Sequence, residues 1–141
     1  MTSAVASDVL AANARLLDAI EAGDFAAYSA GCADDLTCFE PEARGSRVSG
    51  LAFHKFYFDL GGGGGADPTT SRQTTLVEPR CRLVGADGSA AVVTYLRLVQ
   101  QHGGPGSSGA PTTAKFEETR MYEQREGNWI CVHFHRSVVG E

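Results

Sequence analysis

The sequence predicts an α+β domain in which N-terminal helices pack into the concave face of a strongly curved, mainly antiparallel sheet. Apolar residues recur at helical spacing only in the first part of the chain, up to residue 60. Four strand-like runs follow, at residues 70–84, 90–101, 112–125 and 129–139. The breaks between them are rich in turn-forming residues, which favours antiparallel hairpins. Helices followed by a meander of strands are typical of the α+β class. A curved sheet around the first helix would bury the apolar face of the sheet and the apolar stripe of the helix.

The first helix is expected over residues 7–22, capped by Ser7 or Asp8, whose side-chain oxygens can accept a free first-turn N–H. Its apolar stripe comprises Val9, Leu10, Leu16, Leu17 and Ile20. Gly23 is expected to end the helix, because glycine readily adopts the left-handed conformation of a helix C-terminus. A second short helix, capped by Asp24, should then pack antiparallel to the first.

A short hairpin and a third helix are expected in the middle of the chain. Residues 36–40 are typical of a strand that ends at Pro41, and residues 48–50 are its expected hairpin partner. The third helix covers residues 51–60. Its predicted core residues are Phe53, Phe56 and Tyr57.

Two glycine-rich segments are predicted to be surface loops of a single domain that spans residues 1–141. The first is a flexible loop at residues 61–68, which begins with five consecutive glycines. A phosphate-binding loop would need a strand before it and a helix after it, and here the order is reversed. The second is a hairpin tip at residues 103–110.

The composition disfavours several classes of partner. The chain has 141 residues and a formal net charge of -5, without a run of Lys or Arg. Nucleic acids and anionic membranes are therefore not expected to bind. No apolar run reaches the ~20 residues that span a bilayer, and no signal peptide is evident, so a cytoplasmic location is expected.

Each of three late strands is expected to carry one arginine on its core-facing side, because residues i and i+2 of a strand share a face. The expected sets are Tyr95, Arg97 and Val99, then Glu118, Arg120 and Tyr122, then Ile130, Val132, Phe134 and Arg136. Buried arginines need partners, since desolvating a charge costs several kcal/mol.

The cysteines and the strand histidines are expected to be structural. Cys32, Cys38, Cys81 and Cys131 form no CxxC pair and are interpreted as buried free thiols in a reducing compartment. His133 and His135 share a face, but no third ligand is placed beside them, so no metal site is predicted. Trp129 has the same parity as His133, and that face is expected to pack against the domain or a neighbouring subunit.

Several segments, in collinear order, carry a resemblance to a known family. They are residues 23–25 with Tyr28, 36–43 (LTCFEPEA), Gly50 with 53–58, 95–98, 117–120, and 127–129 with 132–136. Together they resemble the association (hub) domain of calcium/calmodulin-dependent protein kinase II, over nearly the whole chain. The glycine-rich segments at 61–65 and 103–109 depart from the usual loops of the family, and no kinase domain lies in this chain.

The resemblance implies an NTF2-like fold and a non-enzymatic role. It implies self-assembly into a stacked ring of about a dozen subunits that would organise attached or partner kinase-type domains, without a cofactor. In the family, arginines at the positions of Arg97, Arg120 and Arg136 line a deep pocket, and His54 matches a further pocket residue.

Two interpretations of the arginines stay open, and an enzyme is kept as an alternative. The arginines either bind a small carboxylate, which suits guanidinium groups, or form an internal ion network with Glu40, Glu42 or Glu118. The alternative is a stand-alone NTF2-like isomerase, dehydratase or hydrolase that acts on a small carboxylate. Its base would need a raised pKa, which nearby arginines oppose.

Overall fold

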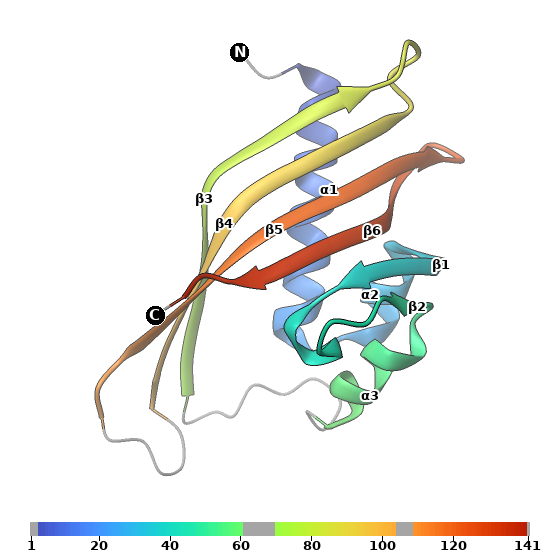
Figure 1. The fold of residues 1–141 in the computed structure, drawn as a ribbon. Coiled ribbons are helices and arrows are strands. Elements are labelled where there is room, and N and C mark those ends of the chain that lie inside the picture. The colour runs from blue at the N-terminus through green and yellow to red at the C-terminus, as the bar shows by residue number, and fades with distance from the viewer. Residues whose placement is uncertain (1–2, 61–69, 104–108, 141) are drawn as a thin grey trace.

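The computed structural model describes residues 3–60, 70–103 and 109–140, and places a curved sheet beside one long helix (Figure 1). The helices are α1 (Ala4–Ala22), α2 (Phe25–Ala30), the 3-10 helix η1 (Pro41–Ala43) and α3 (Ala52–Leu60). The strands are β1 (Cys32–Phe39), β2 (Val48–Ser49), β3 (Thr70–Val84), β4 (Ala90–Gly103), β5 (Thr112–Arg125) and β6 (Asn128–Val138). They form one sheet in the order β2-β1-β6-β5-β4-β3, which confirms the predicted α+β class.

Helix α1 begins one turn earlier than predicted. Its N-cap is Ser3, whose hydroxyl accepts a hydrogen bond from the Ala6 N–H at 3.1 Å, so Ser7 and Asp8 lie inside the helix. The intervening Ala-Val-Ala run is compatible with a helix, and this allows the earlier serine to act as the cap. Gly23 ends the helix with φ 67°, as predicted.

The core lies between α1 and the concave face of the sheet. On the helix side it contains Val9, Leu16 and Leu17, each fully or almost fully buried. The sheet side contributes Leu36, Cys38, Val93, Tyr95, Tyr122, Trp129, Cys131 and Phe134. Burying one large apolar side chain stabilises the fold by about 1.5–3 kcal/mol, so these contacts fix α1 across the strands.

The short hairpin is present, and it joins the sheet in an unexpected place. Strand β2 pairs antiparallel with β1, as predicted. Strand β1 starts at Cys32, four positions before the predicted start, and its other edge pairs parallel with β6. The sheet is therefore mixed, with its parallel pair formed by the first and the last strand of the described chain.

A β-bulge in β6 alters the predicted alternation of side chains. Tyr122 pairs with Cys131 and Met121 with His133, so Val132 is an extra residue without a partner on β5. Phe134 and Arg136 turn toward the concave side as expected, but Cys131 rather than Val132 faces the core before them. Trp129, 9% exposed, also belongs to the core and not to the face of His133, which corrects the prediction.

Helix α3 presents a different face to the core than its sequence suggested. Phe56 and Tyr57 are 58% and 43% exposed, so their predicted core positions were wrong. His54 is buried instead, and Phe53 and Phe58 pack at the edge of the core. The ring of Phe58 lies 5.1 Å from Tyr28 and 5.4 Å from Phe25, which places α3 against α2.

The glycine-rich loop at residues 61–68 lies outside the described residues, as does most of the hairpin tip at 103–110, so both stay predictions. The four cysteines are free, and Cys81 is half-buried rather than buried. Within the described ranges, none of the helices has the length and apolar character needed to cross a membrane.

Candidate functional site

A pocket of about 250 Å³ opens between α3, the end of β1 and the concave face of the sheet. Its walls contain all four residues predicted from the sequence: His54, Arg97, Arg120 and Arg136. The other lining residues are Ile20, Tyr28, Glu40, Glu42, Tyr57, Phe58, Arg72, Phe116 and Phe134. The structure therefore brings the predicted residues together around one space.

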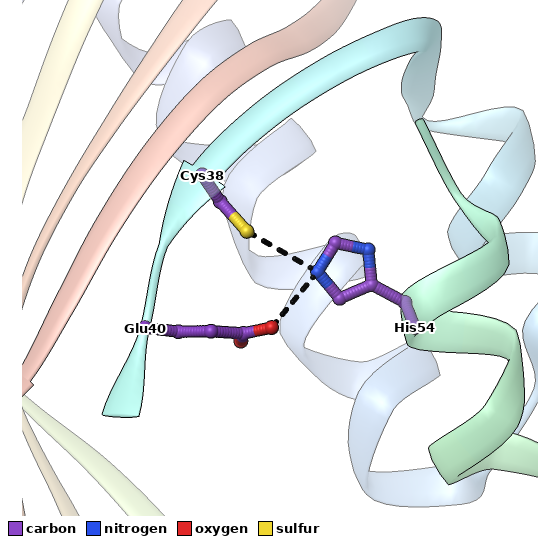
Figure 2. Close-up of side chains that lie close together, drawn as sticks. All are labelled: Cys38, Glu40 and His54. Carbon is purple, nitrogen blue, oxygen red and sulfur yellow. Dashed lines mark hydrogen bonds and ion pairs between the residues drawn. The ribbon is translucent and has the colours of Figure 1, made fainter. Parts of the chain in front are cut away.

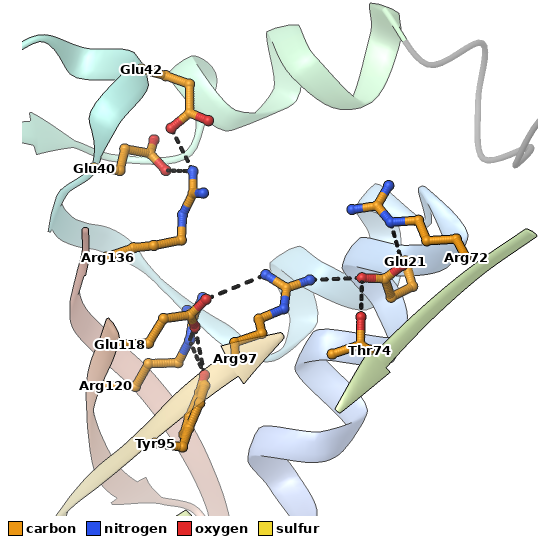
Figure 3. A network of polar contacts seen from close by, with 10 residues as sticks. All are labelled: Glu21, Glu40, Glu42, Arg72, Thr74, Tyr95, Arg97, Glu118, Arg120 and Arg136. Atoms are coloured by element: carbon orange, nitrogen blue, oxygen red, sulfur yellow. Dashed lines mark hydrogen bonds and ion pairs between the residues drawn. The ribbon is translucent and has the colours of Figure 1, made fainter. Parts of the chain in front are cut away.

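Glu118 is the centre of a buried network beneath the pocket (Figure 3). Its carboxylate is 0% exposed and accepts a hydrogen bond from the Tyr95 hydroxyl at 2.6 Å. Arg97 Nη1 and Arg120 Nε each lie 3.3 Å from the carboxylate oxygens. These four residues come from β4 and β5, where strand alternation turns every second side chain toward the concave face.

The end of α1 is joined to this network by Glu21, which the sequence analysis missed. Glu21 accepts hydrogen bonds from Arg97 Nη2 at 2.7 Å and from the Thr74 hydroxyl at 2.7 Å. Arg72 Nε lies 3.0 Å from its other oxygen. Glu21 looks like an ordinary helix-surface residue in the sequence, because its partners lie on strands far along the chain.

Arg136 occupies the opposite side of the pocket. Its Nη2 group bonds Glu42 and lies 3.5 Å from Glu40. The guanidinium also lies over the Phe116 ring, 4.9 Å from its centroid. In the Glu118 network, the Arg120 guanidinium lies over the Phe134 ring, 4.3 Å from its centroid, so aromatic faces stabilise two of the cations.

His54 projects from α3 toward the end of β1 (Figure 2). Its Nε2 atom lies 3.2 Å from Glu40 Oε1 and 3.4 Å from Cys38 Sγ. Burial acts to raise the pKa of Glu40, but the hydrogen bond with His54 and the charge of Arg136 outweigh it, and the net pKa is below the ordinary value. Glu40 is therefore held ionised at neutral pH.

The charges around the pocket balance, because each arginine is paired with a glutamate. Arg72 and Arg97 meet Glu21, while Arg97 and Arg120 also meet Glu118. Arg136 meets Glu40 and Glu42, as the interpretation of an internal ion network expected. Three buried nitrogen atoms still have no hydrogen-bond partner among the described residues: His54 Nδ1, Arg97 Nε and Arg120 Nη1.

The two strand histidines lie away from this pocket. His133 Nδ1 is 2.7 Å from the Thr37 hydroxyl, and His133 and His135 both contact the ring of Phe39. These contacts agree with a structural role for the pair on the outer side of the sheet.

Both the sequence and the fold of this chain are similar to those of known proteins. The family described as "Calcium/calmodulin dependent protein kinase II association domain" matches residues 5–140. The chain belongs to this association-domain family. Calcium/calmodulin-dependent protein kinase type II subunit delta of Oryctolagus cuniculus is 42% identical over 130 residues, which cover 92% of this chain and 23% of that protein.

Solved structures agree with this assignment. The CaMKII hub homology domain of Chlamydomonas reinhardtii has a TM-score of 0.84 and 45% identity to this association domain, covering 98% of this chain and 100% of that one. A protein of the NTF2-like family from Streptomyces avermitilis, 20% identical with a TM-score of 0.73, covers 96% of this chain and 97% of that one and shows the shared fold alone. The association domain spans less than a quarter of the length of the curated kinase relatives that it matches.

The ion network predicts a loss of stability in acid. Burial favours a raised pKa for Glu118, but the charges of Arg120 and Arg97 and the Tyr95 hydrogen bond lower it below the ordinary value of 4.5. A depressed folded-state pKa contributes stability that is fully present above the unfolded-state pKa and is lost as pH falls through the folded-state value. The urea concentration at the midpoint of unfolding should therefore stay constant with pH near neutrality, and it should decrease as the pH is lowered below about 4.5. Glu118→Gln should show a shallower fall than wild type, and an identical slope would contradict this contribution of Glu118.

Proposed function

We propose that this association domain is a self-assembly module, which forms a closed ring-shaped homo-oligomer and thereby gathers kinase-type domains attached to it or bound by it. The proposal is supported by family membership over nearly the whole chain. Closed point-group symmetry is usual for homo-oligomers, because every copy then uses its contact surfaces. A ring of about a dozen subunits is the size expected from the family resemblance.

Apolar side chains on two separate parts of the surface support contacts between copies. Phe56, Tyr57 and Leu60 are exposed on α3. Phe39, Val77, Met121 and Val138 are exposed on strands of the sheet. Apolar and aromatic residues are typical of the buried centre of subunit interfaces, and two regions allow each copy to meet more than one neighbour.

Mass photometry of the purified chain tests the assembly. We expect one dominant species with many times the mass of a monomer. Met121→Glu should reduce that mass, because a charge would enter an apolar contact, whereas Gln124→Glu at the exposed end of the same strand should not. A wild-type peak at the mass of a monomer or simple dimer would refute the proposal.

The second part of the proposed function is a site for a small carboxylate in the arginine-lined pocket. The supporting observation is that Arg97, Arg120, Arg136 and His54 line one space, while Arg97 Nε and Arg120 Nη1 have no hydrogen-bond partner within the described part of the chain. A carboxylate can accept two parallel hydrogen bonds from one guanidinium group. The small volume of the pocket favours a ligand of few atoms over a polyanion.

The affinity should be modest. The internal glutamates already neutralise the arginines, so a ligand must compete with them for the same donors. A small ligand also gains at most about 1.5 kcal/mol per non-hydrogen atom. We therefore expect a dissociation constant in the micromolar to millimolar range.

Titration with short carboxylates and hydroxy acids, followed by NMR or calorimetry, tests this site. Arg97→Ala should weaken binding at least about tenfold, since a charge-assisted hydrogen bond contributes about 1.5–3 kcal/mol. Arg125→Ala, at an exposed arginine paired with Glu123, is the matched control. The methyl ester of the same acid should not bind. No saturation by millimolar carboxylate would leave the internal ion network as the only role of these arginines.

Catalysis is less well supported than binding. A general base in this pocket would need a carboxylate free of cations and a raised pKa. Among the described residues that line the pocket, Glu40 and Glu42 both contact Arg136, and Glu118 beneath them contacts Arg97 and Arg120. The lowered pKa values of Glu40 and Glu118 make both poor bases.

A further inference from the structure

Three side chains with different donor atoms converge at the end of β1. His54 Nε2 lies 3.4 Å from Cys38 Sγ and 3.2 Å from Glu40 Oε1 (Figure 2). One donor atom from each residue lies within 4.8 Å of the other two. We propose that Cys38, Glu40 and His54 form a transition-metal site, suited above all to zinc, with an open coordination position toward the arginine-lined pocket. This site does not depend on carboxylate binding or on self-assembly.

The backbone holds the three donors in place before any metal binds. Cys38 lies in β1 and is paired on one side with Val48 and on the other with Phe134. Glu40 follows two positions later and therefore projects to the same side of the chain. Ordered strands on both flanks leave the sulfur atom little freedom to move.

The imidazole of His54 is held by aromatic neighbours. Its ring centroid lies 5.6 Å from Phe134, 5.8 Å from Tyr28 and 6.0 Å from Phe53. These contacts fix the ring so that Nε2 faces the thiol and the carboxylate. A ligand set with fixed orientation loses little conformational entropy when a metal binds.

The distances agree with a tetrahedral centre. Zinc binds cysteine sulfur at about 2.3 Å and histidine nitrogen or carboxylate oxygen at about 2.0–2.2 Å. In a tetrahedron these bond lengths place the nitrogen about 3.6 Å from the sulfur and about 3.4 Å from the oxygen. The observed separations are 3.4 Å and 3.2 Å, each within a few tenths of an ångström of these values, and the sulfur and carboxylate oxygen lie within 4.8 Å of each other.

The donor types select the metal. A thiolate, an imidazole and a carboxylate suit zinc and related transition metals, whereas Mg²⁺ and Ca²⁺ prefer oxygen ligands alone. Three protein ligands are the number found in zinc sites that keep one position open. Glu40 and His54 both line the pocket, so this fourth position is reachable by a small molecule.

The surroundings complete the site. Arg136 Nη2 lies 3.5 Å from Glu40 Oε2, which leaves Oε1 to face His54 and the metal position. Such outer contacts orient ligating carboxylates. Binding converts the thiol and M²⁺ into a metal thiolate and releases one proton to solvent. The thiolate and the Glu40 carboxylate together then neutralise the two positive charges of the ion.

Cobalt(II) is the probe for the test, because its spectrum reports coordination number and sulfur ligation. The full chain is freed of metal with a chelator and titrated with Co²⁺ in the absence of carboxylates. We expect one equivalent to bind per chain, with a thiolate-to-cobalt charge-transfer band and visible bands of four-coordinate intensity, and zinc should displace the cobalt. Cys38→Ala should remove the charge-transfer band and weaken zinc binding at least about a hundredfold.

Two controls make the outcome decisive. Cys81→Ala removes the half-buried thiol outside this cluster and should leave the cobalt spectrum unchanged. Cys38→Ser keeps the side-chain volume and should also lose the charge-transfer band, so a folding defect of the alanine variant cannot explain the result. Absence of the band in wild type, or its persistence in both Cys38 variants, would overturn the proposal. Carboxylate titration of the metal-free protein tests the proposed pocket function separately.

Discussion

Replacing Glu118 with alanine is expected to lower the free energy of unfolding by about 3–5 kcal/mol, because it leaves buried cations without their carboxylate. Arg120 has a side chain that is 2% exposed, and its described carboxylate partner is Glu118. Arg97 would retain Glu21, so most of the loss arises at Arg120. A buried ion network need not make the fold more stable than an apolar core of the same size would. Removing one member still lowers the stability strongly, because its partner is left as an unpaired buried charge.

Chemical denaturation at a fixed protein concentration measures this loss. Glu117→Ala is the matched control, since Glu117 is the preceding residue on β5 and is exposed on the other face. It should change stability by no more than about 0.5 kcal/mol. Glu118→Gln keeps the shape of the side chain and a hydrogen-bond acceptor for Tyr95. Its free energy of unfolding should lie between those of the Glu118→Ala and Glu117→Ala variants. Equal stability of the Glu118 and Glu117 alanine variants would show that the network is not coupled to folding.

A second large effect is expected at Leu36, the fully buried leucine of β1. Leu36→Ala should destabilise the domain by about 2–5 kcal/mol, because it removes apolar contacts and leaves a cavity. Leu36 precedes Cys38 and Glu40 on the same strand, so its packing also positions the side chains at the end of β1.

Leu36→Met is the control for this position. It keeps the volume of the side chain and should cost less than about 1.5 kcal/mol. The two variants are compared by their urea midpoints under conditions where they share one oligomeric mass. If alanine and methionine had the same effect, cavity formation would not be the cause of the loss.

Local patterns predicted most of the architecture because they act over a few residues. Strand alternation placed Arg97 and Arg120 on the core side, and their burial confirms it. The same rule failed in β6, where the bulge at Val132 shifts the phase and moves Trp129 into the core. A bulge arises from pairing with β5, and one strand's own sequence does not reveal it.

The site residues also divide into those that the sequence identified and those that only the tertiary structure brings together. The resemblance to a family identified His54 and the three arginines, which the structure places around one pocket. Glu21 and Arg72 were missed, because their ion pair joins a helix to a distant strand. The metal-type cluster was missed for a similar reason: Cys38 and Glu40 share a strand face, but His54 reaches them only through the position of α3.

The parallel pairing of β1 with β6 has a consequence for how the chain folds during synthesis. Cys32 and Cys131 are partners in this pair, and Phe39 is paired with His135. Strand β1 can pair early with β2, but it lacks its other partner, β6, until the ribosome has made almost all of the domain. Contacts between such distant residues give a high contact order, which slows folding. We expect the nascent N-terminal segment to expose its apolar residues to chaperones until β6 emerges and completes the sheet.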